Sequence, residues 1–418
     1  VGLPQPSRRR AKTRGCDTMI SELRKQDDLL GNISKNNASA IYIPSNYDEA
    51  MISINKTDWI HAVGDEINSM EVEEVFTSVP LSDALREVPH ESILGTKWLR
   101  LLFSTACLRC CKVRTFDVNV AFIHSLIDKP VYIWPPKGMN VPKHNVLKLK
   151  KALYGKKQAS RCWWLYLKGI LQKIGFTNNK EDPSTYTFNQ GEDQAILWVH
   201  VDDGALTASL DTLLSWFTGK LDEHLKIKWD ANVSGLIGIS IKETCEGFKF
   251  WQPDLINKLT TLKPSMITAK TPSPMGCQLE SDYSDNNMDK PYLKRICILL
   301  YIVQASQPDI SYAVNYLARF SLRTNQSHWD ALEHLISYMR GTRDMGILIS
   351  KSNSSSDIKC FVDANWGGEG NRSTHGYIIS HGLNPIGWQS KRQTTIASST
   401  AQAEYMSLSH AAKEVLWL

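Results

Sequence analysis

The chain has 418 residues, with 48 Lys and Arg against 43 Asp and Glu and a formal net charge of +5. This small excess of positive charge excludes a highly cationic packaging protein. Hydrophobic residues make up 42% and charged residues 22%, as in folded soluble proteins, and the length predicts two or three domains of about 150 residues each.

The hydropathy pattern does not predict a membrane span. The longest apolar run, Ile296–Val303, is under half of the roughly 20 residues that a spanning helix needs, and no charged-then-apolar leader opens the chain. We therefore expect a soluble intracellular protein, cytoplasmic or nuclear, with no membrane partner. Because the chain starts without Met and ends inside a helical pattern, we also expect a fragment of a longer protein.

The nine cysteines are an odd number and are scattered along the chain, so we expect no disulfide framework. Cys107 and Cys110 have the spacing of half a zinc site. No second Cys or His pair follows at a matching distance to complete a tetrahedral shell. We therefore expect buried thiols in this stretch.

The first 46 residues read as a disordered basic lead-in, because they combine clustered arginines with few apolar positions. A domain built around a sheet is predicted over residues 47–262. Its first helix is indicated by helical spacing of Trp59, Val63, Ile67 and Met70.

From residue 112 onward, short β-rich runs alternate with helical segments, which is typical of an α+β sheet domain. The clearest predicted helix is Ala159–Ile174. The predicted strands are Val113–Val118, Val131–Trp134, Ile196–Val201 and Leu236–Ile241.

Residues 263–290 are polar and rich in proline, and we interpret them as a linker. Residues 291–350 are predicted to form a helical connection, with helices over Tyr292–Gln304, Ile310–Phe320 and Ser327–Arg340. The last domain, residues 351–418, is predicted to hold strands followed by a helix. The strands are Ile358–Val362, Gly376–Ser380 and Pro385–Gln389, and the helix starts near Ser399, with Ser398, Ser399 and Thr400 as candidate N-caps.

Two segments deliver carboxylates from predicted strands. An apolar run over residues 198–201 ends in the adjacent acids Asp202 and Asp203, and the strand Val113–Val118 carries Asp117. A pair of Mg²⁺ ions needs carboxylate oxygens from separate segments, and such a pair stabilises the attacking and leaving oxygens in phosphoryl transfer. An Asp-Asp pair alone is a weak indication, because most such pairs are surface turns or caps.

The motifs around these acids give a more specific result. The runs Phe116–Phe122, Val131–Gly138, Leu149–Trp163 and Val201–Asp203 stand in an order and spacing that resemble the reverse transcriptase of copia-type LTR retrotransposons. The resemblance continues through Gln307–Val314. It ends in Phe361–Trp366 and Ser398–Tyr405, which are similar to the RNase H part of the same Pol polyprotein, so that it covers residues 47–418.

The resemblance implies an RNA-directed DNA polymerase with Mg²⁺ as cofactor and an RNA template, a DNA primer and dNTPs as partners. Asp117 and Asp202 would be the principal metal ligands, and Asp203 the neighbouring catalytic acid. Phe122 falls where the family has an aromatic residue that excludes a 2′-hydroxyl.

Further site residues follow from the same resemblance. Gly155, Lys157 and Gln158 belong to the segment that lies against the template and the incoming nucleotide, and Leu236–Gly238 resembles the strand that grips the primer. In the nuclease part, Asp363 and Glu404 match two metal-binding acids. The expected fold is therefore an α+β palm-type reverse transcriptase domain, a helical connection and a partial RNase H-like α/β domain; the oligomeric state is left open.

The chain also departs from the family. Only 18 residues separate Trp98 from Asp117, so we expect shortened fingers that lack the basic residues holding the triphosphate. The sequence ends about one helix after Glu404, and we expect no RNase H activity from this chain alone. His200 replaces a Tyr, and we assign it no catalytic role. The alternatives are a catalytically inert relic that at most binds nucleic acid, and a host interaction protein that needs no intact site.

Overall fold

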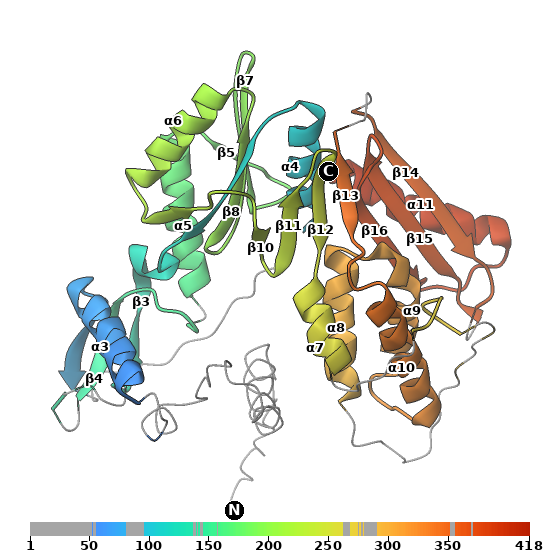
Figure 1. Ribbon diagram of the computed structural model, residues 1–418, viewed down its shortest axis with the longest axis horizontal. Helices are drawn as coiled ribbons and strands as arrows, with labels where there is room; N and C mark the ends of the chain where they lie inside the picture. Colours follow the sequence, from blue (N-terminus) through green and yellow to red (C-terminus); the bar gives the residue numbers. More distant parts are fainter. Residues whose placement is uncertain are drawn as a thin grey trace, which may run out of the picture. The chain divides into compact units, whose positions relative to one another are not determined.

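The computed structural model (Figure 1) divides into two compact units. One comprises residues 1–88 and 126–153, and the other residues 89–125 and 154–418. The predicted lead-in and most of the predicted linker lie outside the residues that the structure describes. The described residues are 52, 56–80, 96–136, 139, 141–142, 145–156, 158–261, 268–274, 276, 279, 291–351, 356–368 and 371–418.

The first unit contains helix α3 (Lys56–Val72) and an antiparallel sheet in the order β1-β4-β3. Its strands are β1 (Phe76–Pro80), β4 (Asn145–Lys151) and β3 (Leu126–Ile133). The helix predicted from apolar spacing is confirmed, and the predicted strand near Val131 is the second half of β3. Strands β1 and β4 had not been predicted.

The second unit is built around a six-stranded antiparallel sheet in the order β5-β6-β7-β8-β2-β9. Helix α5 (Ala159–Lys173) packs against β5, and α6 (Asp211–Asp222) packs against β7 and β8. Strand β2 and helix α5 confirm two predicted elements. The strands are β5 (Thr177–Asn178), β6 (Thr185–Gln190), β7 (Asp193–His200), β8 (Asp203–Ala208), β2 (Val113–Val118) and β9 (Ile227–Trp229).

Helix α4 (Thr96–Leu108) precedes β2 and was not predicted. Its buried face packs on a second antiparallel sheet in the order β10-β11-β12-β13, where Phe103 meets Phe248 and Phe250 with ring centroids 5.0 Å away. The thiol of Cys107 is buried as expected, whereas Cys110 is exposed. The strands are β10 (Gly235–Leu236), β11 (Ile239–Glu243), β12 (Gly247–Trp251) and β13 (Ile347–Ser350). The prediction of one strand over Leu236–Ile241 is wrong, because a turn at Ile237 and Gly238, both with positive φ, reverses the chain between β10 and β11.

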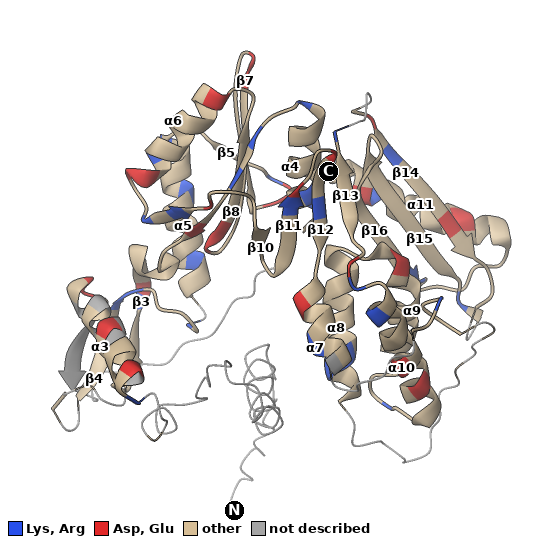
Figure 2. Cartoon of the chain, in the orientation of Figure 1, with Lys and Arg blue, Asp and Glu red and all other residues tan. Residues whose placement is uncertain are grey.

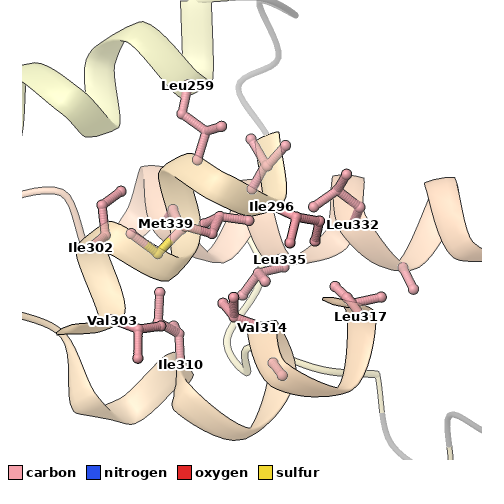
Figure 3. Close-up of a cluster of buried hydrophobic side chains, with 14 of the residues drawn as sticks. Leu259, Ile296, Ile302, Val303, Ile310, Val314, Leu317, Leu332, Leu335 and Met339 are labelled. Atoms are coloured by element: carbon pink, nitrogen blue, oxygen red, sulfur yellow. The ribbon is translucent and has the colours of Figure 1, made fainter. Parts of the chain in front are cut away.

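Four helices form a separate apolar core, in which side chains such as Leu259, Ile296 and Leu335 point toward one another (Figure 3). The last three of these helices confirm the predicted helical segments. A capping box at Asn325, with reciprocal hydrogen bonds to His328, fixes the start of α10. The helices are α7 (Pro253–Thr261), α8 (Tyr292–Ala305), α9 (Ser311–Ala318) and α10 (Gln326–Gly341), with the 3₁₀ turn η3 (Pro308–Ile310) before α9.

The last part of the second unit is a three-stranded antiparallel sheet, β14-β15-β16, with helix α11 (Thr400–Leu416) across one face (Figure 1). The side chain of Ser399 accepts a hydrogen bond from the amide of Gln402, which confirms Ser399 as the N-cap. Each predicted strand is found, and each is longer than predicted. The strands are β14 (Ile358–Asn365), β15 (Thr374–His381) and β16 (Asn384–Arg392).

Within the described part of the chain, no helix combines the length and the apolar character that crossing a membrane requires.

Candidate active site

Strand pairing brings the three predicted polymerase acids to one end of the six-stranded sheet. Asp117 on β2 lies directly opposite Asp203 on β8 in the antiparallel register. Asp202 lies in the turn between β7 and β8, and its carbonyl accepts a hydrogen bond of 2.8 Å from the amide of Val118. Two segments far apart in the sequence therefore place Asp117 and Asp202 together.

The turn that carries Asp202 contains a strained residue, Val201, and is supported by a hydrogen bond from a tryptophan. Val201 has a φ of 58°, in the left-handed region that β-branched residues rarely adopt. The indole Nε1 of Trp163, on α5, donates a hydrogen bond of 2.6 Å to the carbonyl of Val201. Trp163 is itself buried, so it supports the turn from the protein interior and does not offer a base-stacking surface.

The acids influence one another electrostatically. Desolvation raises the pKa of Asp117 above its usual value, and the charge of Asp202 raises it further. Lys228, directly opposite Asp117 on β9, acts in the other direction. A site that gathers negative charge in this way favours a bound cation.

The carboxylate of Asp203 accepts a hydrogen bond from the protein backbone. Its Oδ2 accepts a hydrogen bond of 2.9 Å from the backbone amide of Ile237, in the turn between β10 and β11. Burial raises the pKa of Asp203, and the Ile237 amide opposes that shift. One carboxylate oxygen of Asp203 is therefore committed to the protein backbone.

Tyr154, to which the sequence analysis assigned no role, also belongs to this site. Its hydroxyl donates a hydrogen bond of 3.1 Å to Oδ2 of Asp202, and its side chain is 45% exposed. Its ring meets that of Phe122 edge-on, with centroids 4.2 Å apart, and Phe122 is only 6% exposed. The predicted discriminating aromatic therefore lies beneath Tyr154. The sequence signal for a site role of Tyr154 was its position directly before Gly155 in the motif.

The other predicted substrate-binding residues lie just after Tyr154. Gly155 has a φ of 78°, which glycine adopts without strain, and no atom crowds the position that a Cβ would take. Gln158 is the N-cap residue of α5, and its carbonyl accepts the amide of Cys162. Lys157 lies outside the described residues.

His200 stands beside Asp202 without taking part in this arrangement. Its ring stacks on Trp198, with an interplanar angle of 18°. Burial lowers its pKa, although the charges of Asp202 and Asp182 oppose the shift. The lowered pKa favours the neutral form of the ring near pH 7.

In the C-terminal sheet, one predicted nuclease acid, Glu404, contacts the backbone next to the other, Asp363. Oε1 of Glu404, on α11, accepts a hydrogen bond of 3.3 Å from the amide of Ala364, next to Asp363 on β14. The hydroxyl of Ser407 donates to the carbonyl of Asp363 at 3.0 Å. Figure 2 shows acidic residues both at the β8 end of the large sheet and where β14 runs beside α11.

Asp117 and Asp202 offer Mg²⁺ two carboxylates, which is less than a complete set of ligands. In the described part of the chain, no three His, Cys, Asp or Glu side chains gather into a group that could hold a metal ion. Mg²⁺ commonly binds through one or two carboxylates together with substrate phosphates and water. Asp117 and Asp202 supply such a pair, so the ion is compatible with the site once a phosphate-bearing substrate is present.

Comparison with known proteins relates the chain to a family. Residues 72–273 match the sequence model of a family described as reverse transcriptase (RNA-dependent DNA polymerase). The chain is 34% identical over 335 residues to the retrovirus-related Pol polyprotein from transposon RE1 of Arabidopsis thaliana, covering 78% of this chain and 23% of that protein. It is 29% identical over 337 residues to the corresponding polyprotein from transposon TNT 1-94 of Nicotiana tabacum, covering 77% and 25%.

The chain thus spans about a quarter of the length of these curated relatives. Among solved structures, it is similar to a foamy viral protease-reverse transcriptase in complex with dsDNA, with a TM-score of 0.48, 12% identity, and coverage of 92% of this chain and 76% of that one. The motifs predicted this relationship, and the comparisons confirm it: residues 72–273 match the reverse transcriptase family, and more than three quarters of the chain is similar to retrotransposon Pol polyproteins of the copia type.

Proposed function

We propose that this chain catalyses RNA-templated DNA synthesis, with Asp117 and Asp202 as the ligands of two Mg²⁺ ions. The observation that carries this proposal is the meeting of these two acids, which the β2–β8 pairing and the hydrogen bond from Val118 to Asp202 bring together. The match of residues 72–273 to the reverse transcriptase family supports it.

In the proposed reaction, the primer 3′-hydroxyl attacks the α-phosphate of a dNTP in line, and pyrophosphate leaves. Bound Mg²⁺ would neutralise charge on the attacking and leaving oxygens. Asp117 and Asp202 would bind the Mg²⁺ ions. The Tyr154 hydroxyl orients the Asp202 carboxylate through a hydrogen bond. The ring pair of Tyr154 and Phe122 limits the space beside the incoming sugar, which favours dNTPs over rNTPs.

The proposed partners are an RNA template, a DNA primer and dNTPs. Gly155 leaves open space in which a strand or nucleotide could approach the backbone closely, and Lys157 and Gln158 follow it. The turn at residues 236–238 would grip the primer. These assignments extend the family relationship to particular residues of this chain.

For the sheet β14–β16 with α11, we propose a partial RNase H-like domain with Asp363 and Glu404 as metal ligands. The hydrogen bond from Ala364 to Glu404 supports this assignment, because it holds the Glu404 carboxylate beside the strand that carries Asp363. Two exposed carboxylates would bind Mg²⁺ weakly, because few ligands share the charge and the rest of the shell must be water.

The test is dNTP incorporation on a poly(rA)/oligo(dT) template with Mg²⁺, comparing the purified chain with its Asp202→Asn variant. We expect incorporation by the unchanged chain and none by the variant. Asp254→Asn is a matched control, because Asp254 is an exposed acid in the first turn of α7. Equal incorporation by the Asp202→Asn variant would overturn the proposed role of that residue.

One observation favours a second candidate, a catalytically inert relic that at most binds nucleic acid. Helix α4 ends at Leu108 and strand β2 begins at Val113, so this stretch contains no strands that could bring basic residues to a triphosphate. Phosphoryl transfer depends on positioning and charge neutralisation. No incorporation by a folded chain, together with retained binding of a primer–template duplex, would favour the relic.

A further inference from the structure

The turn between β10 and β11 contains a backbone conformation that needs support. Ile237 has a φ of 47°, in the left-handed region, and it is β-branched, so its side chain crowds its own backbone there. Gly238 follows with a φ of 71°, which costs glycine little. Residues held in such a conformation persist where surrounding contacts fix them, and they concentrate at functional sites.

Both backbone polar groups of Ile237 are held by side chains from distant elements. Its amide donates a hydrogen bond of 2.9 Å to Oδ2 of Asp203, next to Asp202 on the β7–β8 hairpin. Its carbonyl accepts a hydrogen bond from the hydroxyl of Tyr301, on α8. The strained residue is therefore clamped between the hairpin that carries the acids and a helix 64 positions later in the sequence.

A second chain of hydrogen bonds reaches the same turn from the end of α8. The carbonyl of Gly238 accepts a hydrogen bond of 3.4 Å from Nε2 of Gln252, whose Oε1 accepts one of 3.1 Å from the hydroxyl of Ser306. Gln252 and Ser306 are each only 1% exposed. Two successive carbonyls of the turn are therefore fixed from α8, directly or through Gln252.

Gly238 itself is exposed, so the supported turn presents backbone to solvent near the acids. A position without a side chain allows close approach of a nucleic-acid strand. The two adjacent acids also have different partners. Asp203 uses a carboxylate oxygen to hold the turn, whereas Asp202 accepts a hydrogen bond from the hydroxyl of the half-exposed Tyr154.

We propose that Tyr301 is a positioning residue for the primer strand, and that Tyr301 and Asp203 together hold the β10–β11 turn in register with the Asp117 and Asp202 carboxylates. In this proposal Asp203 serves as the tether between the two hairpins and not as a principal metal ligand. The proposal rests on the proposed polymerase function for the identity of its ligand, a DNA primer paired with an RNA template.

The test measures duplex binding and metal binding separately in the Tyr301→Phe variant. Binding of a labelled DNA primer–RNA template duplex is followed by fluorescence anisotropy, and binding of Mn²⁺ alone by electron paramagnetic resonance. We expect duplex affinity to fall about three- to tenfold, as loss of one hydrogen bond predicts, with Mn²⁺ affinity unchanged.

Tyr292→Phe is the matched control, because Tyr292 lies on the same helix and its hydroxyl donates a hydrogen bond of 2.9 Å to the carbonyl of Leu317 instead. It removes a comparable hydroxyl–carbonyl bond without touching the turn, so we expect unchanged duplex affinity. An equal loss in both variants would overturn the proposal, because it would show a general effect on α8.

A rescue experiment separates positioning from overall stability. In Tyr301→Phe carrying Ile237→Gly as well, the turn can adopt its left-handed conformation without the clamp. We expect duplex affinity to recover at least half of the loss. No recovery would overturn the view that the clamp acts by holding the Ile237 conformation.

Hydrogen exchange distinguishes a failure of this inference from a failure of the proposed function. Exchange at residues 236–238 should be faster in Tyr301→Phe than in the unchanged chain, whether or not the chain polymerises. Unchanged exchange would overturn the positioning role itself. Faster exchange with no duplex binding by the unchanged chain would instead overturn the proposed polymerase function, and with it the primer as the ligand of the turn.

Discussion

The two acid pairs of this chain invite comparison, because both join a strand acid to an acid from another segment. At Asp117 and Asp202, the surroundings supply a tyrosine hydroxyl to Asp202 and a lysine opposite Asp117. At Asp363 and Glu404, both side chains are exposed, and a backbone amide holds Glu404. The difference shows that a matching pair of acids gives the ligand atoms, whereas neighbouring groups determine how firmly they are oriented.

The two regions are nevertheless physically connected through α4. The Arg100 guanidinium is buried, donates to the carbonyl of Ile386 at 2.8 Å and to those of Gln304 and Ala305 at 2.9 and 3.1 Å, and stacks over Trp388. Burial lowers the pKa of Arg100 to about 9, which leaves it charged at neutral pH. One side chain therefore ties α8 to β16.

Replacing Arg100 is expected to have the largest effect, since it would break the connection between the compared regions. Arg100→Met removes the guanidinium that donates to three carbonyls, two of them in buried hydrogen bonds, and should lower the free energy of unfolding by about 3–5 kcal/mol. Urea unfolding followed by tryptophan fluorescence measures the loss. Arg109→Met, at the exposed end of the same stretch, should change stability little. A similar small change in Arg100→Met would show that the two regions are not coupled through this residue.

The second prediction sharpens the comparison between the acid pairs. Asp202→Asn should weaken Mn²⁺ binding at the tighter site by about a hundredfold or more, because it removes a ligand and not merely an orienting partner. Asp363→Asn should leave that tighter site intact and remove only weak binding. Electron paramagnetic resonance of Mn²⁺ distinguishes the two. Equal effects of both substitutions would contradict the ranking of the sites.

The third prediction tests the orienting hydroxyl that the first site has. Tyr154→Phe keeps the ring against Phe122 but removes the hydrogen bond to Asp202. Loss of such an outer partner should weaken Mn²⁺ binding about tenfold. Tyr312→Phe, on α9 and 50% exposed, is the control. Unchanged affinity in Tyr154→Phe would mean that the hydroxyl does not orient the carboxylate.

The last and smallest effect concerns pH and the C-terminal sheet. His375 is 1% exposed, and its Nδ1 has no hydrogen-bond partner among the described residues. Burial lowers its pKa below the ordinary value of 6.5, the charges of Lys391 and His410 lower it further, and the hydrogen bond with Gln389 opposes these effects.

Protonation of the His375 ring is easier in the unfolded chain than in the folded one, because folding lowers its pKa. The stability contributed by neutral His375 is therefore complete above pH 6.5 and falls as the pH drops below 6.5. His375→Asn should reduce this acid sensitivity, measured as the change in urea midpoint between neutral and mildly acidic buffer. His224→Asn, at an exposed site, should leave the sensitivity as it is. An unaltered pH dependence in His375→Asn would assign it to other groups.

Local pattern predicted those elements whose periodicity is undisturbed. Strand β2 matches its predicted limits, and α5, α8 and α10 lie within one or two residues of theirs, because their apolar spacing is regular. Helix α4 was missed because Arg100 and Ser104 interrupt its apolar face, yet both are buried against partners remote in sequence. Strands β1 and β4 were missed because they are defined by pairing with each other, and the sequence pattern of each segment alone does not indicate that pairing.

For the site, the sequence alone determined which acids are present, in what order, and to which family their motifs belong. Only the tertiary structure decided their surroundings: Tyr154 bonds to Asp202, Phe122 lies beneath it, and Asp203 holds Ile237. The physical reason is that motifs record neighbours along the chain, whereas a hydrogen bond such as that from Tyr301 to Ile237 depends on packing between elements separated by many residues.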